Sequence, residues 1–122
     1  MGFKLGNRSS KPTHRGGVRV VQTPLESGTI AEARNDGTIA VNPSVNPKSA
    51  LMKRVMKHEM KHMRDMKDGK SDYGENWLMW DGKVYLRRTI DGEKVIDGPA
   101  GRLPEGHKDH PWEKEAIAAE KE

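Results

Sequence analysis

The chain has 122 residues, of which 33% are hydrophobic and 33% are charged, so it predicts a single domain with a small core. It contains no cysteine, which excludes disulfides and thiolate metal sites. No apolar run approaches the ~20 residues that cross a bilayer, and the first residues lead into no signal-peptide core, so we expect a soluble protein. The net charge of +4 permits an acidic partner without requiring one.

The first part of the chain is expected to form a basic arm followed by three short strands. Residues 1–17 are polar, basic and rich in glycine, which indicates an arm that becomes ordered only when it docks. A single domain then covers residues 18–122. The predicted strands cover residues 18–22, 29–34 and 38–42. The sequence Asn35-Asp36-Gly37 between the last two is a hairpin signal.

One long helix is predicted in the middle of the chain. Asn46 suits the N-cap and Pro47 the first helical position, where its missing N–H costs little. No proline or glycine follows until Gly69, which is a natural stop. The helix would hold roughly 20 residues and measure about 30 Å at ~1.5 Å per residue.

A meander and a second helix are predicted after it. Asp81-Gly82 and Asp91-Gly92 separate β-prone runs, which predicts three antiparallel strands over residues 77–96. Residues 98–111 are rich in glycine and proline and are expected to be loop, after which Pro111 starts a final helix. The pattern predicts an α+β fold, with small antiparallel sheets packed on a long helix that carries HEMKH, and with a C-terminal helix.

The sequence HEMKH, residues 58–62, has the spacing of a metal site. Residues four apart on a helix differ by only ~40° in direction, so His58 and His62 project from one face and can share one Zn²⁺. Glu59 is turned by about 100° from His58, where it can act as a general base on a water bound to the metal. Asp65 is placed to orient a ligand histidine as an outer carboxylate. The motif therefore predicts two ligands and a base.

A catalytic zinc ion usually has three protein ligands, so a third is needed. Asp68 follows His62 at the spacing of HExxHxxGxxH/D, but Asp65 replaces the glycine that turns the chain back, so the helix is expected to continue past it. A carboxylate from a second packed helix is the favoured solution. The candidates are Glu113, Glu115, Asp68, His107 and His110.

The combination of HEMKH with the later HPWEKEA resembles the short gluzincin-type zinc metallopeptidases, which pair HExxH with a glutamate on a later helix, often in an ExxA context. The resemblance covers about residues 29–119, and Glu113-Lys114-Glu115-Ala116 matches ExxA. It implies that His58, His62 and Glu113 bind zinc, that Glu59 is the base, and that Glu115 is the competing third ligand. It also places TIAVN, residues 38–42, as the edge strand that binds the substrate.

The opening FKLGNRSS is similar to the opening of some bacteriophage cell-wall peptidases, whose own zinc motif is missing here. Small HExxH proteins with basic arms also occur among phage tail and baseplate components. The resemblance implies a soluble protein of the phage virion, or otherwise of the cytoplasm. Its expected partners are a peptide or peptidoglycan substrate and, through the arm, phage structural proteins.

Three functions follow from these patterns. The leading hypothesis is a zinc-dependent peptide-bond hydrolase that acts on cell wall or virion proteins. The second is a catalytically inactive structural protein of a phage tail or baseplate with a metallopeptidase-like fold. The third is a basic nucleic-acid-binding module, because lysines and arginines dominate residues 48–70. No aromatic residues interleave with these cations, so a solvated face is expected there and a nucleic-acid partner is not.

Overall fold

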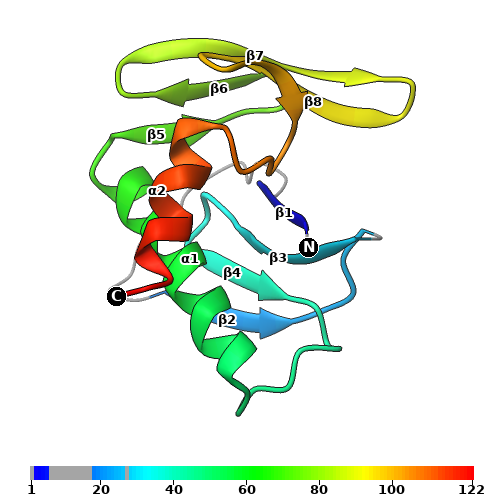
Figure 1. Cartoon of the computed structure of the whole chain (residues 1–122), viewed down its shortest axis with the longest axis vertical. Helices are drawn as coiled ribbons and strands as arrows, with labels where there is room; N and C mark the ends of the chain where they lie inside the picture. The colour runs from blue at the N-terminus through cyan, green and yellow to red at the C-terminus, as the bar shows by residue number, and fades with distance from the viewer. Residues whose placement is uncertain (1, 6–17, 27) are drawn as a thin grey trace.

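Figure 1 shows a computed structural model of the chain, which describes residues 2–5, 18–26 and 28–122. The described residues form a mixed α+β structure with antiparallel strand pairs and two helices, one of them C-terminal, as the sequence predicts. The first sheet has four strands in the order β1-β3-β4-β2, and the second has five in the order β5-β6-β7-β8-β9. Helix α1 packs on β3 and β5, and α2 packs on α1.

The first sheet is built around the predicted hairpin. Its strands are β1 (Gly2–Leu5), β2 (Arg19–Gln22), β3 (Thr29–Ala33) and β4 (Thr38–Val41). Strands β3 and β4 pair antiparallel, and the Thr38 N–H donates to Asp36 Oδ1 at 2.9 Å to close the turn. Gly37 adopts a φ of 91°, which a side chain would disfavour. This hairpin is confirmed.

The outer strands of this sheet differ from the expectation. Strand β1 pairs in parallel with β3, and β2 pairs in parallel with β4, so the sheet is mixed rather than purely antiparallel. The expectation that TIAVN forms an edge strand is wrong, because β4 has a hydrogen-bonded neighbour on each side and all four of its residues are buried. Strand β1 comes from the predicted arm of residues 1–17, and residues 6–17 lie outside the described residues.

Helix α1 (Ala50–Lys67) begins later than the sequence predicts. Ser49 is the N-cap, and its Oγ accepts a hydrogen bond from the Met52 N–H at 3.1 Å. The predicted cap, Asn46, instead accepts from the Lys48 N–H within the preceding turn. Asn46 and Ser49 both have side chains that can cap a helix. Ser49 is the N-cap because the Asn46 side chain is already hydrogen-bonded within the preceding turn.

The second sheet is longer than the predicted three-stranded meander. Its strands are β5 (Ser71–Tyr73), β6 (Trp77–Trp80), β7 (Lys83–Ile90), β8 (Glu93–Gly98) and β9 (Gly101–Pro104). The two Asp-Gly turns are confirmed, since both residues of each turn have positive φ. Strand β9 corrects the expectation that residues 98–111 are all loop. It lies at the sheet edge, where Pro104 is tolerated because an edge residue can lack an N–H donor.

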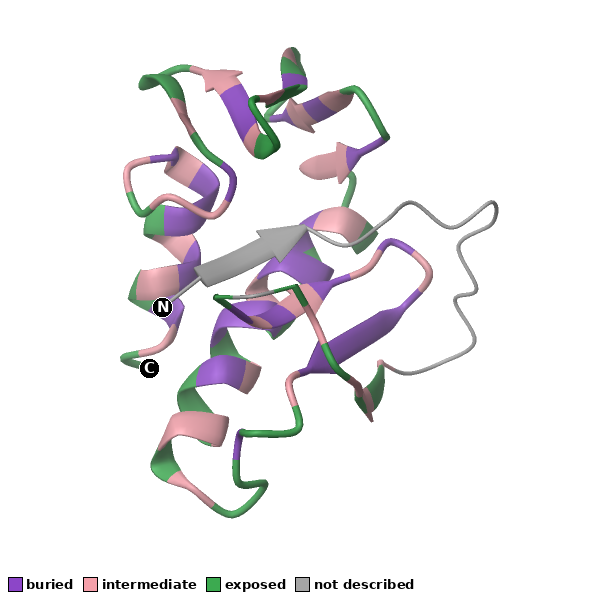
Figure 2. Cartoon of the chain, turned by 90° about the vertical axis from the view of Figure 1, so that its right-hand side faces the viewer, coloured by how far each residue is buried: buried purple, intermediate pink, exposed green. Residues whose placement is uncertain are grey.

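Two clusters of buried residues hold these elements together. The cluster between α1 and the first sheet contains Ala31, Ala33, Ile39, Val41, Val45, Val55 and Met63. The cluster under the second sheet contains Tyr73, Leu78, Trp80, Ile96 and Trp112. Met66 packs against both clusters, so α1 joins the two sheets. Figure 2 shows where buried and exposed residues lie along α1 and the strands.

Helix α2 (Pro111–Ala119) runs alongside α1 and carries proline in its first turn, as predicted. Trp112 fixes the start of this helix, because its ring packs in the second cluster at 6.0 Å from the Trp80 ring centroid. In the part of the chain that the structure describes, neither helix combines the length and apolar character that a membrane crossing requires.

Candidate metal centre

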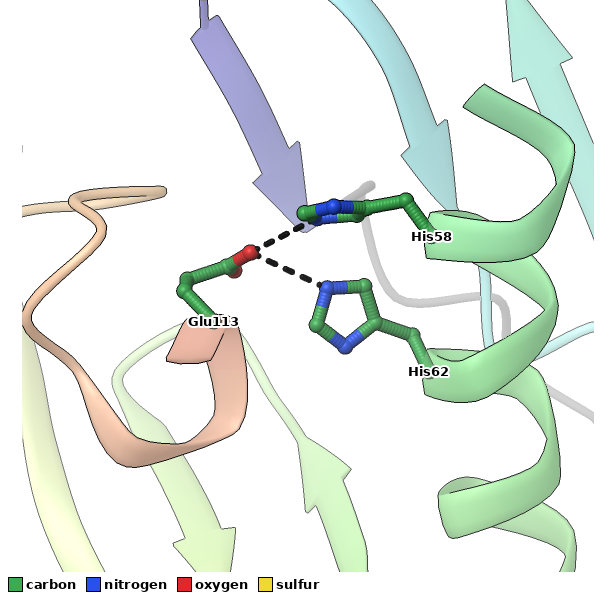
Figure 3. A group of neighbouring side chains, drawn as sticks. All are labelled: His58, His62 and Glu113. Carbon is green, nitrogen blue, oxygen red and sulfur yellow. Dashed lines mark hydrogen bonds and ion pairs between the residues drawn. The ribbon is translucent and has the colours of Figure 1, made fainter. Parts of the chain in front are cut away.

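Three buried side chains from the two helices converge on one point. His58 and His62 come from α1, and Glu113 comes from the first turn of α2 (Figure 3). Their potential ligand atoms all lie within 4.8 Å of one another. Glu113 Oε1 is 2.9 Å from His58 Nε2 and 3.2 Å from His62 Nε2. The same carboxylate oxygen therefore faces both imidazoles.

The helical spacing explains why the two imidazoles meet. His58 and His62 are one turn apart on the same face, and their ring centroids are 5.0 Å apart with the planes at 73°. Neither residue is more than 5% exposed. Glu113 reaches them because Trp112, the preceding residue, is anchored in the second core cluster and sets the position of the first turn of α2.

Glu120 is a functional candidate that the sequence interpretation missed. Its Oε2 lies 2.8 Å from His58 Nδ1. A neutral His58 that donates Nδ1–H to this carboxylate presents the lone pair of Nε2 to Glu113. A lone pair and a carboxylate oxygen repel each other at 2.9 Å, so a cation, either a proton or a metal ion, is required between them. The sequence could have indicated Glu120, because its spacing of seven residues from Glu113 places both glutamates on the same side of α2.

The donor set fits zinc. Two histidines and one glutamate form a known ligand set of catalytic zinc, with a fourth position left for water or substrate. Ligand atoms at ~2.0–2.1 Å from a tetrahedral zinc ion lie about 3.3 Å apart. The distances of 2.9 and 3.2 Å from Glu113 to the two histidines are close to that value. An acidic partner on the far nitrogen of a ligand histidine, here Glu120, is typical of zinc sites.

Burial and mutual charge set the protonation of this group. Burial lowers the pKa of His62, but the neighbouring carboxylates, Glu113 foremost among them, together raise that pKa to about 9. Burial also acts to raise the pKa of Glu113, but His62 and His58 hold it down at about 2. Without a metal, the group therefore keeps an anionic glutamate between imidazoles that retain a proton. A metal ion would replace that proton.

Glu59 lies beside this group and is buried. It is 1% exposed, and within residues 2–5, 18–26 and 28–122 its Oε2 has no hydrogen-bond partner. Burial raises its pKa to about 7, although His62 and His58 act in the opposite direction. A buried carboxyl group without a partner is costly for stability. Near neutral pH it is poised to take up and release a proton, which is the property of a general acid or base.

The other acidic candidates have different partners. Glu115 Oε1 accepts from Lys70 at 2.9 Å and lies 3.2 Å from Lys61 Nζ, so it belongs to an ion-pair cluster outside the metal group. Asp65, proposed as an outer carboxylate, accepts from Lys61 at 2.6 Å. Asp68 is the exposed C-cap of α1 and is not part of the group.

The two histidines of the late loop also lie elsewhere. His107 Nδ1 accepts from the Asp109 N–H at 3.1 Å. His110 is fully buried and stacks on Trp112 at a centroid distance of 4.6 Å. Its Nε2 lies 3.1 Å from the Pro104 carbonyl, so the ring fastens the loop to the start of α2. Burial lowers the pKa of His110.

His62 also borders a small cavity between α1, α2 and the β5–β6 edge of the second sheet. The cavity is lined by His62, Met66, Ser71, Asp72, Tyr73, Leu78 and Trp112. Most of its lining is apolar, and it gives one side of the metal group an adjacent space.

No protein-family model, curated protein or solved structure matches this chain. What the protein does must therefore be inferred from the geometry and chemistry of this group of side chains.

Proposed function

We propose that the protein is a zinc-dependent peptide-bond hydrolase, with α1 serving as its HExxH helix. The observation that carries the proposal is the buried Glu59 carboxyl, whose Oε2 has no hydrogen-bond partner among the described residues, beside a convergent pair of histidines and a glutamate. An ion-pair network that served stability alone would not retain an extra buried acid without a partner, because that acid lowers stability. A hydrolase needs such a group.

Each residue has a defined part in this proposal. His58, His62 and Glu113 would hold the zinc ion, while Glu120 fixes the tautomer of His58. Zinc, when bound, polarises a peptide carbonyl and makes a water molecule more acidic. Glu59 takes a proton from the attacking water as the C–O bond forms. It then gives the proton to the leaving amine nitrogen as the C–N bond breaks, so the carboxylate is regenerated.

The substrate proposed from the resemblance is a peptide, either within the bacterial cell wall or in virion proteins. The cavity beside His62 has room for about one water molecule, so it leaves space next to the metal group without defining a pocket for a substrate side chain. The phage origin is supported by the opening FKLGNRSS and by the basic arm.

A structural role for the metal is the second candidate, and burial favours it. His58, Glu59, His62 and Glu113 are each at most 5% exposed. A closed site of this kind can serve as a cross-link between α1 and α2, because metal binding contributes free energy of folding. The protein would then be a non-catalytic tail or baseplate component.

A Glu59→Gln variant separates the two functions. Zinc content and hydrolysis of a fluorogenic peptide library and of purified peptidoglycan would be measured for the variant, the wild type and Glu115→Gln, the control from the ion-pair cluster. The hydrolase predicts that Glu59→Gln keeps its zinc and loses about 10²–10⁴-fold in rate, while Glu115→Gln keeps both. A zinc-loaded wild type that cleaves neither substrate would establish the structural role instead. Unchanged hydrolysis by Glu59→Gln would refute the role of Glu59 as the general base.

A further inference from the structure

The solvent-facing side of α1 is almost entirely basic. The exposed residues of this helix from position 53 onward are Lys53, Arg54, Lys57, Met60, Arg64 and Lys67, with Asp68 at the C-cap. We call the five cations among them, Lys53, Arg54, Lys57, Arg64 and Lys67, the basic stripe. The rise of ~1.5 Å per residue makes the stripe about 21 Å long.

The stripe and the metal group lie on different sides of α1. At about 100° per residue, the five cations fall within an arc of roughly 140°, whose centre is roughly 130° from that of His58 and His62. The histidines are buried and the stripe is exposed. A ligand of the stripe would therefore leave the metal group uncovered, and its binding does not depend on the proposed hydrolysis.

The stripe has no acidic counterpart in the described structure. Lys61 and Lys70, at its border, form ion pairs with Asp65 and Glu115, but no carboxylate side chain of the described residues pairs with a cation of the stripe. Lys57 donates a hydrogen bond to the main-chain carbonyl of Glu122. The stripe therefore retains nearly its full charge.

This accumulation of charge is not a simple consequence of composition. Residues 1–17 contain four of the 22 lysines and arginines and none of the 18 acidic residues. The remaining 18 basic and 18 acidic residues cancel, so the rest of the chain is formally neutral. The fold nevertheless collects five cations on one side of one helix. The arm, which has no acidic residue, cannot neutralise them and adds charge of the same sign.

The chemistry of the stripe selects among polyanions. It carries no aromatic residue on which the bases of a single strand could stack. Met60, 41% exposed, is the one apolar residue among the exposed residues of α1 from position 53 onward, whereas a specific protein partner usually requires an apolar interface centre. A duplex presents one negative charge per ≈ 1.7 Å, so about a dozen phosphates lie along 21 Å. We propose that the basic stripe of α1 binds the phosphate backbone of double-stranded DNA without reading its sequence.

The test uses the full chain and a fluorescently labelled DNA duplex of mixed sequence. Anisotropy titrations between about 50 and 200 mM salt give the slope of log K against log salt concentration. Five phosphate contacts predict a slope near −4.5, and thus a loss of about 10²–10³-fold in affinity over this range. The stripe variant replaces Lys53, Arg54, Arg64 and Lys67 by glutamine and should have a slope shallower by about 3–4.

The matched control removes the same charge from another part of the surface. It replaces Lys83, Arg88, Arg102 and Lys108 by glutamine, all exposed on the second sheet or in the following loop. The control should keep the wild-type slope, and circular dichroism would verify that both variants fold. Three results would overturn the proposal: absence of duplex binding at about 50 mM salt, an equal change of slope in the control, or equally tight binding of polyglutamate by the stripe. Zinc content of the same samples tests the metal group separately.

Discussion

Glu120→Gln is the most informative change at the metal centre, because it removes charge and keeps shape. Glu120 Oε2 lies 2.8 Å from His58 Nδ1, and the side chains of His58 and Glu120 are 1% and 20% exposed. The oxygen of glutamine can still accept the Nδ1–H hydrogen bond. The variant therefore isolates the contribution of the carboxylate charge to the orientation and basicity of His58.

The expected magnitude follows from that single contact. Hydrogen bonds to charged groups contribute about 1.5–3 kcal/mol, against about 0.5–1.5 for neutral pairs. The loss of charge should therefore weaken zinc binding by about 1–1.5 kcal/mol, or roughly tenfold. Glu120→Ala also leaves a buried N–H without an acceptor, which raises the expected cost to about 2–3 kcal/mol, or roughly 30- to 150-fold.

Competition for zinc against a chromophoric chelator measures both affinities at one pH. Glu115→Gln is the control, because it lies on the same helix and its carboxylate contacts Lys70 and Lys61 instead of a histidine. Equal zinc affinities in the wild type and both Glu120 variants would show that Glu120 does not support the binding of zinc by His58. A loss of the same size in Glu115→Gln would lead to the same conclusion, because the effect would then reflect helix charge alone.

Three further predictions concern stability. Folding of the metal-free protein should weaken as the pH rises from about 5 to 9. The pKa of Glu59 rises from 4.5 to about 7 on folding, so the free energy of unfolding falls as the pH rises between those values. The stabilising contribution of His62 is complete below pH 6.5 and is lost as the pH passes about 9. A free energy of unfolding that stays constant or increases between pH 5, 7 and 9 in chemical denaturation would contradict this prediction. Ile39→Ala should cost about 2–5 kcal/mol in denaturant unfolding, since Ile39 is fully buried between α1 and the sheet, and a cost below about 1 kcal/mol would contradict this packing. Tyr73→Phe should lower the free energy of unfolding by about 1–2 kcal/mol in the same measurement. The Tyr73 hydroxyl donates to the Ala33 carbonyl and accepts from the Asn35 N–H, both at 3.3 Å. An unchanged free energy of unfolding would show that these hydrogen bonds do not join the two sheets.

Local turn and helix chemistry could be predicted from the sequence. A two-residue hairpin turn of this type requires positive φ at both of its central residues, and few dipeptides other than Asp-Gly tolerate this. Asp81-Gly82 and Asp91-Gly92 both form such turns. Pro111 marks the start of α2 for a similarly local reason. The exact start of α1 could not be predicted, because Asn46 and Ser49 both have capping side chains and the choice depends on the turn between them.

The pairing of strands that are distant in the sequence could not be predicted from local sequence patterns. The parallel strands β1 and β2 join a hairpin that follows them in the sequence, and nothing in residues 2–5 or 19–22 specifies their neighbours. Strand β9 lies in a segment whose glycine and proline content favours loop, yet the free edge of β8 supplies the hydrogen bonds that make it a strand. The order of the first sheet, and with it the central position of β4, follows from these tertiary contacts.

The candidate site divides in the same way. The spacing of His58 and His62 along one helix is sufficient to place them together, so helical periodicity alone indicates the pair. Glu113 could be named as the third member only through the resemblance, since Glu115 is two residues away and the sequence does not say which one faces α1. Packing of Trp112 in the second cluster decides this, and it also brings Glu120 to His58.

Zinc stoichiometry combined with X-ray absorption at the zinc edge would show whether His58, His62 and Glu113 hold a metal ion. We expect one zinc ion per chain in the wild type, with two imidazole nitrogens at ~2.0–2.1 Å and at least one oxygen ligand. We also expect loss of that zinc in His62→Ala and in Glu113→Ala. A purified protein that takes up no zinc after metal addition and dialysis, or a bound zinc whose spectrum lacks imidazole scattering, would contradict the metal centre and the hydrolase built on it.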